Sequence, residues 1–127
     1  MSTISPPVAM LGEPAPQILH LPPDVRSLDA AAEARELARS VGMTPDRAQE
    51  LTLEAALGER ADGTWAAFEV ADIEPRQNGK GDTIQIRELA GLFLFGERLL
   101  IHTAHEFPTA NEAFLRMVAV IESNRDL

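Results

Sequence analysis

Cysteine is absent from the sequence, which excludes disulfides, thiolate metal sites and cysteine nucleophiles. No apolar run is long enough to span a membrane, and the N-terminus has no basic segment followed by an apolar one. We therefore expect a soluble, intracellular protein. Positive charge is also scarce, because 11 Lys and Arg residues stand against 20 Asp and Glu residues, for a net charge of -9. This balance opposes nonspecific attraction to nucleic acid, so any contact with DNA must come from a local patch.

The chain does contain enough apolar material for one ordinary domain, since 45% of its 127 residues are hydrophobic. Six of the nine prolines fall within the first 26 residues, at Pro6, Pro7, Pro14, Pro16, Pro22 and Pro23. Proline at this density is incompatible with a regular helix or a central strand. The sequence predicts a disordered Pro-rich arm over residues 1–26, with a docking arm as the alternative, and a folded unit over residues 27–127.

Two helices are predicted after the arm. Ser27 is the expected N-cap of a helix over residues 28–41, which Gly42 ends. Thr44 is the expected N-cap of the second helix, with Pro45 in its first position. The buried stripe of the first helix is expected to consist of Leu28, Ala31, Ala32, Arg35 and Ala38.

The same two helices have the spacing of a helix-turn-helix. The alternative interpretation of this helix pair is therefore a DNA-binding motif. Its recognition helix would carry three acidic side chains toward the DNA, Asp46, Glu50 and Glu54. Because acidic groups are repelled by phosphates, we do not favour DNA reading by this pair.

Residues 65–73 form an extended apolar segment that is predicted to be a strand, although it also contains Glu69 and Asp72. Residues 83–95 allow a helix or one strand of a hairpin, and apolar residues at helical spacing favour the helix, namely Ile86, Leu89, Ala90 and Phe93. Residues 98–103 are predicted to be a second strand, parallel to the first.

The last predicted element is a helix that begins with a capping box at Thr109–Glu112 and frays after Ser123. Its buried stripe is expected to consist of Ala113, Phe114, Met117 and Ile121. The whole order predicts an α/β fold, in which two helices are followed by a β-loop-α-β-α unit with parallel strands.

The loop over residues 75–82 is the centre of this prediction. Gly79 and Gly81 flank Lys80, so the backbone can approach a ligand, direct several N–H groups to one point and add a positive charge. These properties favour a phosphate site. The strict Walker A pattern is not met, because Glu74 replaces its first glycine and Gly81 its hydroxyl residue. The alternative is an ordinary Asn-Gly surface turn.

Four blocks in order resemble the large terminase subunits of tailed bacteriophages, especially those of actinobacterial phages with an Arg-x-x-Gly-Lys variant of Walker A. The blocks are Trp65–Val70, Pro75–Gly81, Arg87–Gly96 and Ile101–Glu106, and the resemblance covers about residues 44–124. It implies a partial P-loop NTPase fold that binds ATP and Mg²⁺. It also implies that the protein acts in the bacterial host cytoplasm. Its partners there would be double-stranded phage DNA, the portal protein and the small terminase subunit.

The resemblance also implies roles for individual residues. Lys80 would neutralise the β- and γ-phosphates, Arg76 would stabilise transition-state charge, and Gln49 would read adenine. With Gly81 lacking a hydroxyl, Thr83 or Asp82 would have to help hold Mg²⁺. The full set of residues expected to bind the cofactor is Gln49, Arg76, Gln77, Asn78, Gly79, Lys80, Gly81, Asp82 and Thr83.

Other features limit this interpretation. No apolar strand ending in Asp-Glu, the Walker B element, follows residue 82, and no nuclease motif is present. We therefore expect a fragment without ATPase or nuclease activity of its own, with an open apolar edge that favours self-association. The residues His102, His105 and Glu106 match no metal motif, so no metal site of the protein itself is predicted. The alternative function is that of a small acidic binding protein without nucleotide chemistry.

Overall fold

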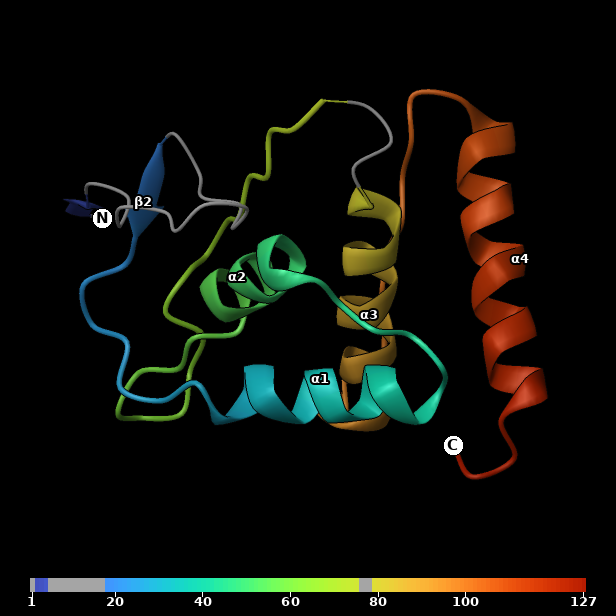
Figure 1. The fold of residues 1–127 in the computed structure, drawn as a ribbon, viewed down its shortest axis with the longest axis horizontal. Coiled ribbons are helices and arrows are strands. Elements are labelled where there is room, and N and C mark those ends of the chain that lie inside the picture. The colour runs from blue at the N-terminus through green and yellow to red at the C-terminus, as the bar shows by residue number, and fades with distance from the viewer. Residues whose placement is uncertain (1, 5–17, 76–78) are drawn as a thin grey trace.

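The computed structural model describes residues 2–4, 18–75 and 79–127. The helices are α1 (Asp29–Ser40), α2 (Arg47–Ala56), α3 (Lys80–Phe93) and α4 (Phe107–Ser123) (Figure 1). The strands β1 (Ser2–Ile4) and β2 (Leu19–Leu21) pair antiparallel. Most of the Pro-rich arm lies outside the described residues. The described part of the chain is therefore mainly helical.

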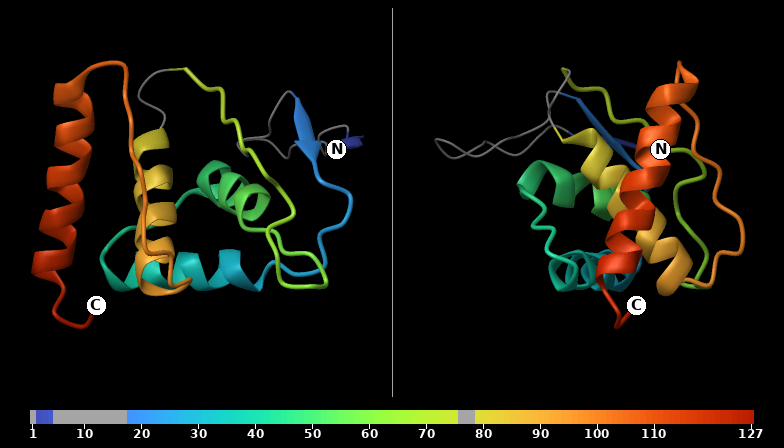
Figure 2. Two further views of the ribbon diagram at one scale, coloured as in Figure 1. Left: turned by 180° about the vertical axis from the view of Figure 1, so that it is seen from behind. Right: turned by 90° about the vertical axis from the view of Figure 1, so that its right-hand side faces the viewer.

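The predicted α/β fold with parallel strands is wrong. Residues 65–73 and 98–103 have extended stretches but join no ladder, and the described residues contain no parallel strand pair. Trp65 makes only an isolated antiparallel bridge to Glu59, which also bridges Ser27. A strand needs a neighbour that satisfies its backbone N–H and C=O groups, and these two segments take different paths, one past α2 and one along α3 (Figure 2). The apolar pattern of residues 65–73 and 98–103 therefore did not lead to a sheet between them.

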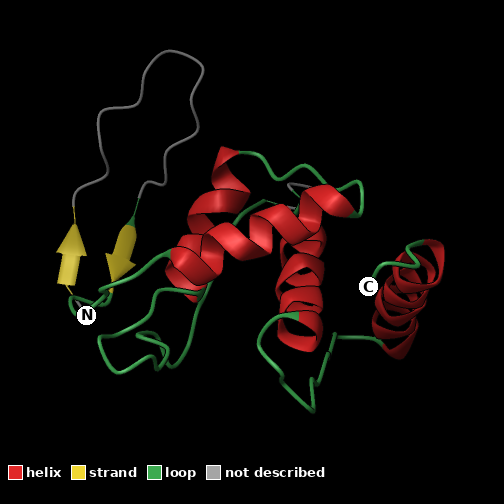
Figure 3. Ribbon diagram, turned by 90° about the horizontal axis from the view of Figure 1, so that it is seen from below, coloured by secondary structure: helices red, strands yellow, loops and turns green. Residues whose placement is uncertain are grey.

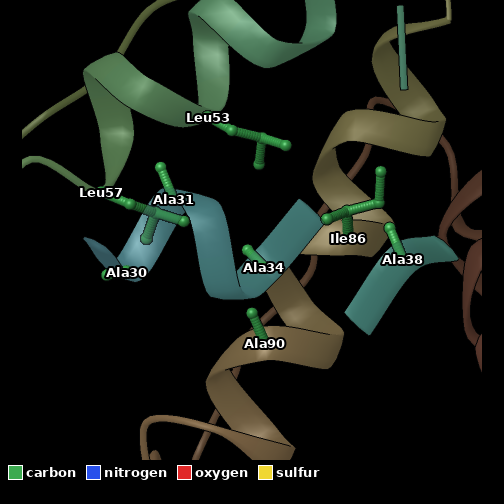
Figure 4. Packing of buried hydrophobic residues seen from close by; sticks show 8 residues of the cluster. All are labelled: Ala30, Ala31, Ala34, Ala38, Leu53, Leu57, Ile86 and Ala90. Atoms are coloured by element: carbon green, nitrogen blue, oxygen red, sulfur yellow. The ribbon is translucent and has the colours of Figure 1, made fainter. Parts of the chain in front are cut away.

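The core forms where α1 crosses α2 and α3. One side of α1 is lined by small residues that are 5% exposed or less, namely Ala30, Ala31, Ala34 and Ala38. Leu53 and Leu57 from α2 and Ile86 and Ala90 from α3 pack onto this side (Figure 4). Short side chains on α1 let the two other helices approach its backbone closely. The predicted stripe was only partly correct, because Leu28 is 45% exposed.

Helix α3 confirms that residues 83–93 are helical and excludes the hairpin, but it begins at Lys80, inside the predicted loop, and ends at Phe93. Ile86, Leu89 and Ala90 are at most 1% exposed, as their spacing predicted. They pack against helices rather than against the expected sheet, because α1 and α2 occupy the side that a sheet would have taken. Phe93 lies at the margin of this contact and is 39% exposed.

The helix ends follow local capping chemistry. The N-cap of α1 is Leu28 and not the predicted Ser27, although Ser27 Oγ accepts a hydrogen bond from the N–H of Asp29 at 3.1 Å. Gly42 follows the end of α1 with a φ of 85°, as predicted. Helix α2 begins at Arg47, later than predicted, because Asp46 and not Thr44 is its N-cap. The Asp46 carboxylate accepts a hydrogen bond from the N–H of Gln49. Thr44, which precedes Pro45, does not make such a bond.

The acidic side of α2 is neutralised within the fold. Glu50 lies 3.6 Å from Arg35 and 3.5 Å from Arg47, and Glu54 lies at the same distances from these two arginines. Two of the three carboxylates that argued against DNA binding, Glu50 and Glu54, are therefore part of an ion-pair network between α1 and α2, whereas Asp46 caps α2. Such half-exposed pairs contribute little stability individually but fix how the two helices are oriented.

Arg87 attaches two loops to α3. Its guanidinium group lies 5.6 Å from the ring centroid of Trp65 and 5.8 Å from that of Phe95. These two rings meet edge to face with their centroids 5.1 Å apart. Arg87 Nη1 also lies 2.7 Å from Glu97 Oε1. The cluster holds the starts of both extended segments against the helix through cation–π and ionic contacts.

Helix α4 stands apart from α1 and α2 and packs on α3 (Figure 3). It begins at Phe107, earlier than the predicted capping box, because Pro108 fits the first turn of a helix. Met117 is buried as predicted, but Phe114 is 62% exposed. The helix ends at Ser123, as expected. No described helix is both long and apolar enough to cross a membrane.

The packing predicts that Leu53→Ala lowers the free energy of unfolding by about 2–5 kcal/mol, because it leaves a cavity in the helical core. Ile73→Ala, at a side chain that is 94% exposed, is the control and should change it by less than about 0.5 kcal/mol. Urea unfolding followed by circular dichroism measures both values. Equal effects of the two substitutions would contradict this core.

Candidate functional site

The loop that precedes α3 ends at a helix N-terminus, as a phosphate site requires. Gly79 is the N-cap, with a left-handed φ of 81°, and Lys80 is the first residue of the helix. The first backbone hydrogen bond of the helix runs from the N–H of Thr83 to the carbonyl oxygen of Gly79, at 3.2 Å. The N–H groups before it have no intrahelical partner, since a helix leaves its first turn unpaired. Arg76, Gln77 and Asn78 lie outside the described residues.

The side chain of Lys80 folds back over the loop. Its Nζ donates a hydrogen bond to the Glu74 carbonyl oxygen at 2.8 Å. Burial raises the pKa of the Glu74 carboxyl group, and the negative charge of Asp72 raises it further, whereas Lys80 acts in the opposite direction. An anion that binds here must therefore draw the ammonium group away from Glu74 and approach near two carboxyl groups.

Gln49 reaches the same loop from α2. Its Oε1 accepts from the N–H of Asp46 at 2.9 Å, which completes the capping box of α2. Its Nε2 donates to the carbonyl oxygen of Gly79 at 3.0 Å. The structure thus brings together Gln49 and the glycine loop, which are 30 residues apart in sequence. Each end of the amide makes one of these bonds, so one N–H donor and one lone pair of Gln49 remain for a further contact.

The two residues expected to help hold Mg²⁺ differ in accessibility. Thr83 is 6% exposed, and its hydroxyl group donates to the Gly79 carbonyl at 3.3 Å. Asp82 is exposed in the first turn of α3. Only the Asp82 carboxylate is therefore available to a cation without a side-chain rearrangement.

Arg116 is a neighbour of the loop that sequence reasoning missed. A Cβ atom added at Gly81 would lie 3.6 Å from Arg116 Nη2, so this guanidinium group of α4 is beside the first turn of α3. Nothing in the sequence marks Arg116, because only the packing of α4 on α3 brings it there. It adds a second cation near the N-terminus of α3.

A cavity of about 280 Å³ adjoins this helix end. The turn between α1 and α2 lines one side, and the first two turns of α3 line the other. Its lining residues are Gly42, Met43, Thr44, Pro45, Gln49, Asp82, Gln85 and Ile86. Sites for complete drug-sized ligands measure about 300–1,000 Å³, so this cavity suits a single heterocyclic ring better than a whole nucleotide.

The histidine-containing segment does not join this site. His102 Nδ1 lies 2.9 Å from Glu88 Oε1, so this side chain is turned toward α3. His105 and Glu106 are exposed. Within residues 2–4, 18–75 and 79–127, no three or more His, Asp or Glu side chains are placed to hold a metal ion.

The loop geometry makes a prediction about its glycine. Gly79→Ala should destabilise the protein by about 1–3 kcal/mol, because the backbone there is left-handed and the new Cβ would lie 2.6 Å from Gln49 Nε2. Gly63→Ala is the matched control, since Gly63 has the same φ of 81° but nothing within 4 Å. Urea unfolding should show a larger loss for Gly79→Ala, and that excess should disappear in a Gln49→Ala background. An equal loss at the two glycines would contradict the Gln49 contact.

Comparison of this chain with protein-family models, with curated proteins and with solved structures finds no match in any of the three.

Proposed function

We propose that the chain is an ATP-binding segment that resembles the N-terminal part of the ATPase domain of a phage terminase large subunit. One observation carries the proposal: Gly79 and Lys80 stand at the N-terminus of a 14-residue helix, beside a small cavity and Gln49. The proposal rests on this local geometry and on the resemblance of the sequence blocks, and not on the parallel sheet, which the described residues lack.

The phosphate groups would bind at the start of α3. Unpaired N–H groups and the positive end of the helix dipole favour an anion there. Lys80 would leave the Glu74 carbonyl to reach the anion, and the Arg116 guanidinium group lies beside Gly81 in the first turn of α3. In the terminase-like chemistry, Arg76 would stabilise charge on the transferring phosphoryl group.

The base would occupy the cavity between the α1–α2 turn and α3. Adenine offers a donor and an acceptor at one edge, which an amide group can match. Gln49 lines the cavity and would do so with its second N–H and second lone pair, while it keeps its bonds to Gly79 and Asp46. Base binding and loop position would thus be coupled through a single side chain.

The fit for Mg²⁺ is partial. When bound with ATP, the cation would bridge the phosphates and neutralise their charge. Asp82 can contribute a carboxylate oxygen from the first turn of α3, whereas the Thr83 hydroxyl is directed to Gly79. This donor set is poor, and we infer that the chain alone binds Mg·ATP weakly and does not hydrolyse it.

The wider assignment follows from the resemblance. The chain would act in the cytoplasm of a bacterial host, together with double-stranded phage DNA, the portal protein and the small terminase subunit. With a net charge of -9, it is not expected to attract DNA nonspecifically by itself.

Calorimetric titration of Mg·ATP tests the site. We expect weak binding that Lys80→Ala reduces by about tenfold or more, because a charged hydrogen bond to phosphate is lost. Arg125→Ala is the control, since it removes one exposed positive charge far along the chain and should leave the affinity unchanged. Equal binding by the wild type and Lys80→Ala would refute the site and favour the small acidic binding protein.

A second titration separates base from phosphate recognition. Gln49→Ala should weaken Mg·ATP more than it weakens magnesium tripolyphosphate, because only ATP carries a base for the cavity. If both ligands lose the same affinity, Gln49 acts through the loop alone, and the adenine assignment fails.

Lys80 is the only lysine in the chain, which permits a direct chemical test. An amine-reactive ester should modify Lys80 several-fold more slowly when Mg·ATP is present at saturation, because the phosphates then cover the ammonium group. Mass spectrometry compares Lys80 with the N-terminal amine as an internal reference. A ratio that ATP does not change would contradict phosphate binding by Lys80.

A further inference from the structure

The segment over residues 98–106 presents an unpaired backbone edge. It leaves the end of α3, lies along the outside of that helix and reaches the start of α4 (Figure 2, left). Among the described residues, no backbone N–H or carbonyl group of residues 98–105 takes part in a hydrogen bond. Residues 99–104 lie between bends at Arg98 and at His105 and Glu106, and an unpaired stretch of this kind can accept another strand.

The side chains of this segment alternate between two faces. His102 is turned inward, toward Glu88 on α3, and Leu100 is half-buried. Leu99 and Ile101 are turned outward and are 76% and 79% exposed. Large apolar side chains that lie next to each other on an unpaired edge favour burial against a partner.

The charges of the segment are self-complementary. Arg98 stands at its start and Glu106 at its end, and neither forms an ion pair within the described part of the chain. In an antiparallel arrangement of two copies, the positive end of one meets the negative end of the other. A two-fold symmetric interface requires this kind of self-complementarity.

We propose that two copies of this chain associate through antiparallel pairing of residues 98–106 around a two-fold axis at His102. This register places Arg98 opposite Glu106 of the second copy, and by symmetry it forms two such pairs. It also places Leu99 opposite His105 and Ile101 opposite Thr103, with the two copies of Ile101 as diagonal neighbours. Each apolar side chain thus gains cross-strand neighbours on the outward face of the pair. The association does not depend on nucleotide binding.

The other extended segment does not have the same property. Residues 66–75 also expose apolar side chains, since Phe68 is 99% and Ile73 is 94% exposed. Their charges, however, are all acidic, at Glu69, Asp72 and Glu74. Two copies paired through this segment would bring like charges together, which is destabilising across strands. Charge thus selects residues 98–106 as the paired edge.

Sedimentation equilibrium of the full 127-residue chain at about 0.15 M salt, where long-range repulsion is screened, tests the proposal. The wild type is expected to show a reversible monomer–dimer equilibrium. Ile101→Lys should raise the dimer dissociation constant by about tenfold or more, because a lysine on a strand edge blocks pairing. Ile73→Lys is the matched control on the acidic segment and should leave the constant unchanged, with circular dichroism showing that each variant is folded.

A charge-reversal cycle tests the register. Arg98→Glu should raise the dissociation constant by about tenfold, since two like-charge pairs replace two favourable ones. Adding Glu106→Arg to that variant should restore most of the affinity. A wild type that stays monomeric, open-ended aggregation in place of a dimer, equal loss with Ile73→Lys, or no restoration in the double variant would each overturn the proposal.

Discussion

The small side chains on α1 set the spacing on which the rest of the described fold depends. Ala31, Ala34 and Ala38 are fully buried, so α2 and α3 can both approach the same side of α1. Larger residues there would separate the helices and leave Leu53 and Ile86 without a common contact. The position of α2 against α3 is fixed by this contact, and the position of Gln49 beside the loop follows from it.

The loop before α3 is consequently held from two directions. Gln49 holds the Gly79 carbonyl from α2, and Lys80 holds the Glu74 carbonyl from α3. The Gly79 carbonyl also accepts from the N–H and the hydroxyl group of Thr83, so Gln49 adds a third bond to it from another helix. Both side chains that the resemblance assigns to the ligand thus already make contacts within the fold. A ligand that moves Lys80 would replace its bond to Glu74, which limits the affinity.

Apolar exposure is the other general property of this structure. Phe68, Ile73, Leu99 and Ile101 are each more than 70% exposed on segments that make no sheet. The helices bury apolar surface within the chain, because each satisfies its own backbone. An extended segment needs a second strand to satisfy its backbone N–H and C=O groups before it can bury apolar surface. Neither extended segment has such a strand among the described residues. The protein thus combines a closed helical core with open extended edges.

The sequence by itself determined the elements whose stability is local. The spacing of Ile86, Leu89 and Ala90 specified α3, and Gly42 marked the end of α1, because periodicity and left-handed glycine act within a few residues. The start of α3 at Lys80 was not determined in this way. The sequence could not determine that residues 65–73 and 98–103 would remain unpaired, since strand pairing depends on segments that must meet in space. It also could not place Arg116 beside Gly81, or decide that Gln49 would bond to Gly79. Those relations come from the packing of four helices, because only tertiary contacts bring together residues that are distant along the chain.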